Sequence, residues 1–146
     1  MNVSRKDIYS YVASLFTSVS KNIFRIDIPI TLNADAASNG FIVLKLDTLS
    51  DNSEFDLSTF ATVRMYVECY VHTTQVDGIS GLMNTAKYDA VQKAIDTIIE
   101  AECKKQNQTF SISNDGILSM DDFYSNNTDA FSVYIKSFKI TITNDI

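Results

Sequence analysis

Tryptophan is absent from this chain, and proline, histidine, cysteine and glycine are scarce, with one, one, two and four residues respectively. The phosphate loops of nucleotide-binding proteins and the nucleophile elbow of hydrolases need closely spaced glycines, whereas the glycines here are scattered. The single histidine, His72, has no cysteine or carboxylate at the spacing of zinc ligands. We therefore expect a protein that is not an enzyme and that has no catalytic residues, no metal and no cofactor.

Long apolar runs are also missing. No stretch approaches the roughly 18 apolar residues that a membrane helix needs. The basic pair Arg5-Lys6 is not followed by the apolar region of a secretory signal, so we expect a soluble protein made in a cytoplasm, without membrane contact. Cys69 and Cys103 both fall in apolar stripes, and in that compartment they are expected to be buried, reduced thiols.

Positive charge is in deficit, because 18 acidic residues face 12 basic ones and the net charge is -6. This balance argues against a protein that grips nucleic acid phosphates over a broad basic face. It is compatible with a protein past which DNA slides, since a negative wall discourages sticking. The 146 residues, 45% of them hydrophobic, predict a single domain over the whole chain with a substantial core.

The strongest pattern is the stretch from Thr85 to Lys104. Its apolar residues recur at the spacing of one helix face. They are Val91, Ala94, Ile95, Ile98, Ile99 and Cys103. Asn84 or Thr85 can cap the first turn. Strand-like segments lie on both sides of this helix in the chain, so its apolar stripe must be buried against a sheet.

A second helix is predicted at the N-terminus. Ser4 can cap it, and Asp7, three residues later, can complete a capping box. Val3 and Ile8 occupy the two positions of a hydrophobic staple around the cap. We expect this helix to run to about Ser18.

After this helix the apolar period changes to two. Strands are predicted over Phe24–Leu32 and Phe41–Leu46, paired as a hairpin through a long, small and polar connection. Pro29 cannot donate a hydrogen bond to a sheet, so it favours an edge strand or a break. A long third strand is predicted over Phe60–His72. Its core side carries Ala61, Val63, Met65, Val67, Cys69 and Val71.

The C-terminal part predicts further strands. Asn114-Asp115-Gly116 is a strong hairpin signal between predicted strands at 109–113 and 117–120. The last strand, Ala130–Thr143, changes the parity of its apolar residues halfway. A β-bulge near Lys136-Ser137 would restore the register. Alternatively, the two halves bury opposite faces, one on the chain's own core and one on a partner.

These elements together predict an α+β fold. It has a largely antiparallel β-sheet, with the N-terminal helix and one long amphipathic helix packed on one face.

The outer row of the long strand is the candidate subunit interface, because it mixes tyrosines with opposite charges. It consists of Arg64, Tyr66, Glu68 and Tyr70, to which Phe138 of the last strand is added. The alternative is a solvated sheet face with cross-strand pairs.

Several polar loops flank the strands. Asp47–Ser58 and Asp121–Asp129 are acidic, but neither has the spacing of an EF-hand, so we interpret their carboxylates as solvated. Whether they line the lumen of an assembly is left open. We expect Asp47–Ser58 and His72–Met83 to become ordered only on assembly, since they offer little apolar surface to bury.

The order of elements resembles that of the tail terminator and tail completion proteins of double-stranded DNA phages, part of the head–tail connector group. An amphipathic helix, Ser4–Ser18, is followed by the two shorter strands. The long alternating strand ATVRMYVECYV leads into the helix TAKYDAVQKAIDTIIEAE, and FSVYIKSFKITIT closes the chain. The resemblance covers most of the sequence.

The resemblance implies a structural virion protein, assembled in the cytoplasm of a bacterial host. Such proteins form homo-oligomeric rings at the phage neck, most often hexamers and sometimes larger rings. The ring contacts other neck, connector or tail tube proteins, and DNA passes through it without specific binding. Heterologous contacts that close produce rings of this kind. The alternative that the residues leave open is a small non-enzymatic adaptor or inhibitor that docks through Tyr66, Tyr70 and their neighbours.

Overall fold

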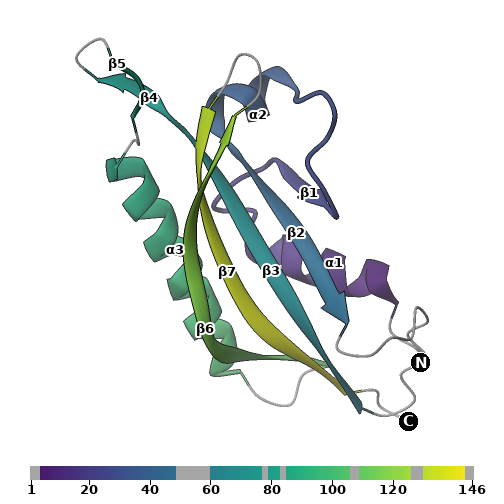
Figure 1. Cartoon of the computed structure of the whole chain (residues 1–146). Helices are drawn as coiled ribbons and strands as arrows, with labels where there is room; N and C mark the ends of the chain where they lie inside the picture. The colour runs from purple at the N-terminus through teal and green to yellow at the C-terminus, as the bar shows by residue number, and fades with distance from the viewer. Residues whose placement is uncertain are drawn as a thin grey trace.

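The computed structural model describes residues 4–48, 60–76, 79–82, 85–105, 109–125 and 130–143. Three helices and seven strands lie within these ranges (Figure 1). In chain order they are α1 (Arg5–Leu15), β1 (Ile23–Arg25), α2 (Ala34–Asn39), β2 (Phe41–Thr48), β3 (Phe60–His72), β4 (Thr74–Val76), β5 (Ile79–Leu82), α3 (Thr85–Cys103), β6 (Phe110–Ser125) and β7 (Ala130–Thr143).

Five of the strands form one sheet in the order β1-β2-β3-β7-β6. β1 pairs with β2 in parallel, and the other neighbours are antiparallel. β4 and β5 form a separate two-stranded hairpin. The α+β fold class with a largely antiparallel sheet is confirmed.

The main core lies between one face of this sheet and the helices α1 and α3. Alternate residues of β3 point into it, as the period of two predicts, and Met65 and Val67 are fully buried. α1 contributes Ile8 and Val12, its C-cap residue Phe16 adds a third side chain, and α3 contributes Ile95 and Ile99. The predicted stripe of the long helix and the predicted core side of the long strand therefore meet, as expected.

α1 begins with the predicted capping box. The Ser4 hydroxyl accepts a hydrogen bond from the Asp7 backbone N–H at 3.2 Å, and the Asp7 carboxylate accepts one from the Ser4 N–H at 2.9 Å. These bonds lower the pKa of Asp7. The helix ends at Leu15 rather than near Ser18. Ser14 and Thr17 bond back to backbone carbonyls there, and such bonds compete with the helical pattern. Val3 lies outside the described residues.

A second core lies on the opposite face of the sheet, which we call the outer face. The aromatic rings of Phe41, Tyr70 and Phe131 meet there, and the Phe41 and Tyr70 rings are stacked at 4.4 Å. α2 covers them through the buried Ala36. One end of the outer face is therefore buried by the chain itself, and not every helix lies on one face.

α2 occupies the segment that the sequence analysis interpreted as a polar connection. Asn33 caps it by accepting a hydrogen bond from the Ala36 N–H at 2.8 Å. Gly40 ends it with φ +88°, and a Cβ at that position would lie 2.3 Å from the carbonyl oxygen of Tyr70. Only glycine fits this close approach between α2 and β3.

The predicted hairpin between Phe24–Leu32 and Phe41–Leu46 is wrong. The first strand stops at Arg25, and Ile26 adopts φ +79°. β1 then pairs in parallel with β2, which requires a crossover, and α2 provides it. Of the alternating apolar residues beyond Arg25, Ile28 and Leu32 pack against the second core, whereas Ile26 and Ile30 are exposed. Of the two alternatives that Pro29 favoured, the break is observed, because β1 ends at Arg25 and Pro29 lies outside the strand.

The hairpin predicted at Asn114-Asp115-Gly116 is also wrong. β6 continues through this segment and pairs with β7 on both sides of it. Asn114 pairs with Phe138 and Ser119 with Lys136, so five steps along β6 (119 − 114) oppose two along β7 (138 − 136). The turn-forming residues therefore form a large bulge within one strand, because the segments on both sides of them pair with β7.

β7 keeps an unbroken register with β3, from Phe60 opposite Thr143 to His72 opposite Phe131. No bulge near Lys136-Ser137 interrupts this pairing, so the change of parity means that the two halves bury opposite faces. Phe131 and Val133 enter the second core, whereas the main core takes Phe138, Ile140 and Ile142. Both halves are buried within the chain.

The segment His72–Met83 contains more structure than predicted, because β4 and β5 form their hairpin within it. Figure 1 shows this hairpin extending from the end of β3, beyond the five-stranded sheet and the start of α3. Asp47 lies in β2, but 49–58 of the predicted acidic loop lies outside the described residues.

Removing a side chain from the main core tests the packing of α3. Ile95→Ala is expected to lower the free energy of unfolding by about 2–5 kcal/mol, because Ile95 is fully buried. Ile98 is only half-buried, so Ile98→Ala should cost less. Urea unfolding measures both, with Thr97→Ala on the exposed side as control. Equal stability of the Ile95 and Thr97 variants would contradict this packing.

Candidate functional site

The outer face of the sheet divides into an apolar half and a polar half. The apolar half is the second core. The polar half is formed by the next rows of cross-strand partners. Its residues are Lys45, Tyr66 and Ser137 in one row, and Asp47, Arg64, Lys139 and Ser113 in the next. No helix of the described part is packed over these rows.

Glu68 lies at the border between the two halves. Its side chain is 12% exposed, and it accepts a hydrogen bond from the Tyr70 hydroxyl at 2.9 Å. The same carboxylate pairs with Lys45 across β2 and β3 at 3.2 Å. Burial, and then the charge of Glu68, raises the pKa of Tyr70 well above its usual range. Glu68 therefore ties the polar rows to the aromatic core and is fixed by its own chain.

Of the predicted interface residues, Arg64, Tyr66 and Glu68 lie on the outer face and are half-buried. Tyr70 points to the same face but is only 7% exposed, because aromatic rings and α2 cover it. Phe138 points to the opposite face and is fully buried in the main core. Tyr70 and Phe138 cannot contact a neighbour while the fold is intact, and the candidate interface is corrected accordingly.

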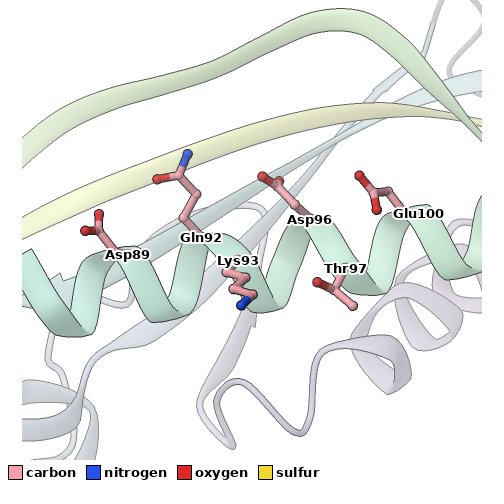
Figure 2. Close-up of a pocket in the computed structure, with 6 residues that line it drawn as sticks. All are labelled: Asp89, Gln92, Lys93, Asp96, Thr97 and Glu100. Carbon is pink, nitrogen blue, oxygen red and sulfur yellow. The ribbon is translucent and has the colours of Figure 1, made fainter.

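A second candidate surface runs along α3. A shallow groove of about 350 Å3 is lined by Asp89, Gln92, Lys93, Asp96, Thr97 and Glu100 (Figure 2). Asp89, Gln92, Asp96 and Glu100 point toward the strands beside the helix, while Lys93 and Thr97 point away. We call the first four the α3 row. Three of its four side chains are carboxylates, so the groove is acidic.

Two tyrosines connect α3 to the sheet beneath this row. Tyr134 of β7 donates its hydroxyl hydrogen to Asp96 at 2.7 Å, and Lys136 lies 3.9 Å from the same carboxylate. Tyr88 of α3 donates to Asp121 of β6. Burial and the bond to Asp121 raise the pKa of Tyr88 well above its usual range. These contacts fix the α3 row alongside β6 and β7.

A buried carboxylate at the other end of α3 was not predicted from the sequence. Glu102 is 7% exposed, accepts a hydrogen bond from the Tyr11 hydroxyl at 2.9 Å and pairs with Lys105 at 2.5 Å. Tyr11 also stacks on Phe110 with ring centroids 4.7 Å apart. This cluster joins α1, α3 and β6. Its sequence signal is faint, because Glu102 stands one residue from the apolar stripe and resembles a surface residue.

The cysteines and the histidine have structural surroundings. Burial raises the pKa of the Cys69 thiol to about 12, and desolvation also raises that of the half-buried Cys103. Neither thiol is activated by its surroundings. His72 packs edge-on against Phe131 at 5.3 Å. Within the described ranges, no three side chains of His, Cys, Asp or Glu are grouped to hold a metal ion.

Membrane-length apolar helices are not found among the described residues.

Two tyrosine substitutions separate the two halves of the outer face. Tyr70→Ala should lower the free energy of unfolding by about 3–5 kcal/mol, since it removes a ring from the second core. Tyr66→Ala should cost about 1 kcal/mol or less, because Tyr66 lies in the polar half. Urea unfolding followed by circular dichroism measures both. Equal losses would mean that the polar half is part of a core.

Comparison with known proteins gives no family assignment: no family model matches the sequence, and no curated protein matches it.

Proposed function

We propose that this protein is a structural subunit of a double-stranded DNA phage virion, forming a ring at the neck or tail junction. In this role it is a tail terminator or head–tail connector ring protein through which DNA passes. The proposal combines the resemblance in element order with the surfaces described above. The long strand β3, the helix α3 and the closing strand β7 supply the order on which the resemblance rests.

The observation that carries the proposal is the β4–β5 hairpin. It continues from β3 and, among the described elements, pairs only within itself. Figure 1 shows it beyond the edge of the sheet. A lone two-stranded hairpin is marginally stable in water and gains stability by packing on something else. An extension of this kind, held on a rigid strand, is suited to reach a neighbouring subunit.

The polar half of the outer face supports the same proposal. Arg64 and Tyr66 belong to the residue types most enriched at binding hot spots. They lie on a different part of the molecule from the hairpin, so one subunit offers two unlike surfaces. A contact between unlike surfaces is heterologous, and it closes into a ring when the rotation between copies allows it.

The charge of the chain fits the passage of DNA. With a net charge of -6, a ring of many copies carries a large negative charge. Phosphate repulsion from such a ring keeps duplex DNA from sticking as it moves. We accordingly expect no retention of linear duplex DNA by the purified protein at about 0.15 M salt, in a gel-shift measurement.

Shortening the hairpin tests the proposal. In one variant, 74–82 is replaced by a short Gly-Ser linker. The parent protein is expected to form rings visible by negative-stain electron microscopy at high concentration, with masses that mass photometry assigns to hexamers or larger species. The shortened variant should remain a folded monomer, because the reach to the neighbour is lost.

Thr97→Lys on the exposed side of α3 serves as the matched control and should still assemble. A second variant, Arg64→Ala with Tyr66→Ala, probes the polar half and should also weaken assembly. A parent protein that stays monomeric at every concentration, or that binds DNA tightly, would favour the adaptor function instead. Rings formed equally well without the hairpin would move the subunit contact elsewhere.

A further inference from the structure

β6 is an open edge of the sheet. It pairs with β7 on one side only and ends the strand order. Its residues Met120, Asp121, Asp122 and Phe123 are all exposed, with Phe123 at 56% and Met120 at 48%. An exposed edge strand presents backbone N–H and C=O groups to any extended chain that approaches it. At this edge the Phe123 N–H donates to the Asp122 carboxylate at 2.8 Å, so an added strand has to displace that carboxylate. Large apolar side chains at such an edge add area for the approaching chain to cover.

The α3 row lies beside this edge. Asp96 is bonded to Tyr134, and Lys136, which also approaches Asp96, pairs directly with Ser119 of β6. Asp121 of β6 accepts the hydrogen bond from Tyr88 of α3. Phe123 stands on the same face of the sheet as α3, since its partner Ser132 is two residues from Tyr134 on β7 and Tyr134 is buried in the main core. A strand added outside β6 would therefore run alongside α3.

The two elements have similar lengths: Asp89 to Glu100 is about 16 Å along the helix axis, and Ser119 to Ser125 is about 20 Å along the strand. Alternate side chains of a strand point to one face and are about 6.6–6.8 Å apart. Residues one turn apart on a helix are about 5.4 Å apart along the axis. The two repeats differ, so the side chains on one face of an added strand would pass along the α3 row without meeting its members one for one. Positive charge on that face of the added strand would complement the acidic row.

We propose that the β6 edge, from Ser119 to Ser125, together with the α3 row, is a docking site for an extended segment of another protein. That segment has lysine or arginine at alternate positions. It pairs its backbone with β6 and places its cations against Asp89, Asp96 and Asp121. Peptide addition to a sheet edge takes its affinity from main-chain hydrogen bonds and its specificity from alternate side chains. This site does not depend on ring formation.

A synthetic peptide with lysine at every second position and valine between is the probe. The full-length protein, labelled with ¹⁵N, is titrated with it at about 0.15 M salt. Binding should shift the amide signals of β6 from Ser119 to Ser125 and those of α3 from Asp89 to Glu100. A peptide with glutamate in place of lysine should not bind. A lysine peptide that is N-methylated at alternate residues should bind at least about tenfold more weakly, since it cannot pair along the edge.

Variants of the α3 row sharpen the test. Asp89→Asn should weaken the lysine peptide about twofold to fivefold, as expected for one exposed charge pair. Asp89→Lys with Gln92→Lys should exchange the preference to the glutamate peptide. Asp27→Asn, at an exposed carboxylate near the opposite edge of the sheet, is the control and should change nothing. The unperturbed amide signals of each variant verify its fold.

Several results would overturn the proposal. If the lysine peptide does not bind at millimolar concentration, Asp121 and Asp122 act only as charges that guard the edge against aggregation. Equal binding of the N-methylated peptide would show that electrostatic attraction acts without strand pairing. Signal changes confined to other parts of the sheet would place the site elsewhere.

Discussion

The continuous pairing of β3 with β7 is the constraint on which the rest of this structure depends. Because the register does not shift between His72–Phe131 and Phe60–Thr143, each side chain of β7 has a fixed face. The first half of β7 is apolar on the outer face and the second half is apolar on the helix face. One strand therefore contributes to two cores. A shift of one residue would exchange every side chain between the faces and expose both sets. The two cores thus fix the register, and the register fixes which surfaces remain open.

The sequence predicted an element correctly where local interactions or one regular apolar stripe determine its structure. α3 and β3 were predicted within a residue of their bounds because each buries one regular stripe. The capping box of α1 was predicted because its bonds join residues three apart. The β1 region failed because its alternation continued past Arg25, where Ile28 and Leu32 turn toward the second core instead of extending a strand. The prediction of a hairpin at Asn114-Asp115-Gly116 failed because both flanking segments pair with β7. This tertiary pairing overrides the local preference for a turn.

The candidate interface was only partly predictable for the same reason. Side-chain parity places Arg64, Tyr66, Glu68 and Tyr70 on one face, and the structure agrees. Parity does not tell which part of a face the chain itself covers. α2 was not foreseen, so its burial of Tyr70 was not foreseen either. Phe138 was assigned to a contact because its half of β7 has the opposite parity. That parity places it in the main core, since α1 and α3 occupy that face.

The distribution of charge follows from this arrangement. Carboxylates that bridge elements are held by tyrosine hydroxyls: Tyr11 with Glu102, Tyr88 with Asp121, and Tyr134 with Asp96. A tyrosine can fill an apolar site with its ring and still reach a polar partner at the rim with its hydroxyl. This lets α3 lie over the sheet margin with an acidic row beside an open strand, without leaving a buried charge unpaired. In the described part, no buried side-chain nitrogen or oxygen lacks a hydrogen-bond partner. The open edge at β6 therefore belongs to a fold in which the described buried side-chain polar atoms are hydrogen-bonded. A strand that joins this edge need not rearrange the core.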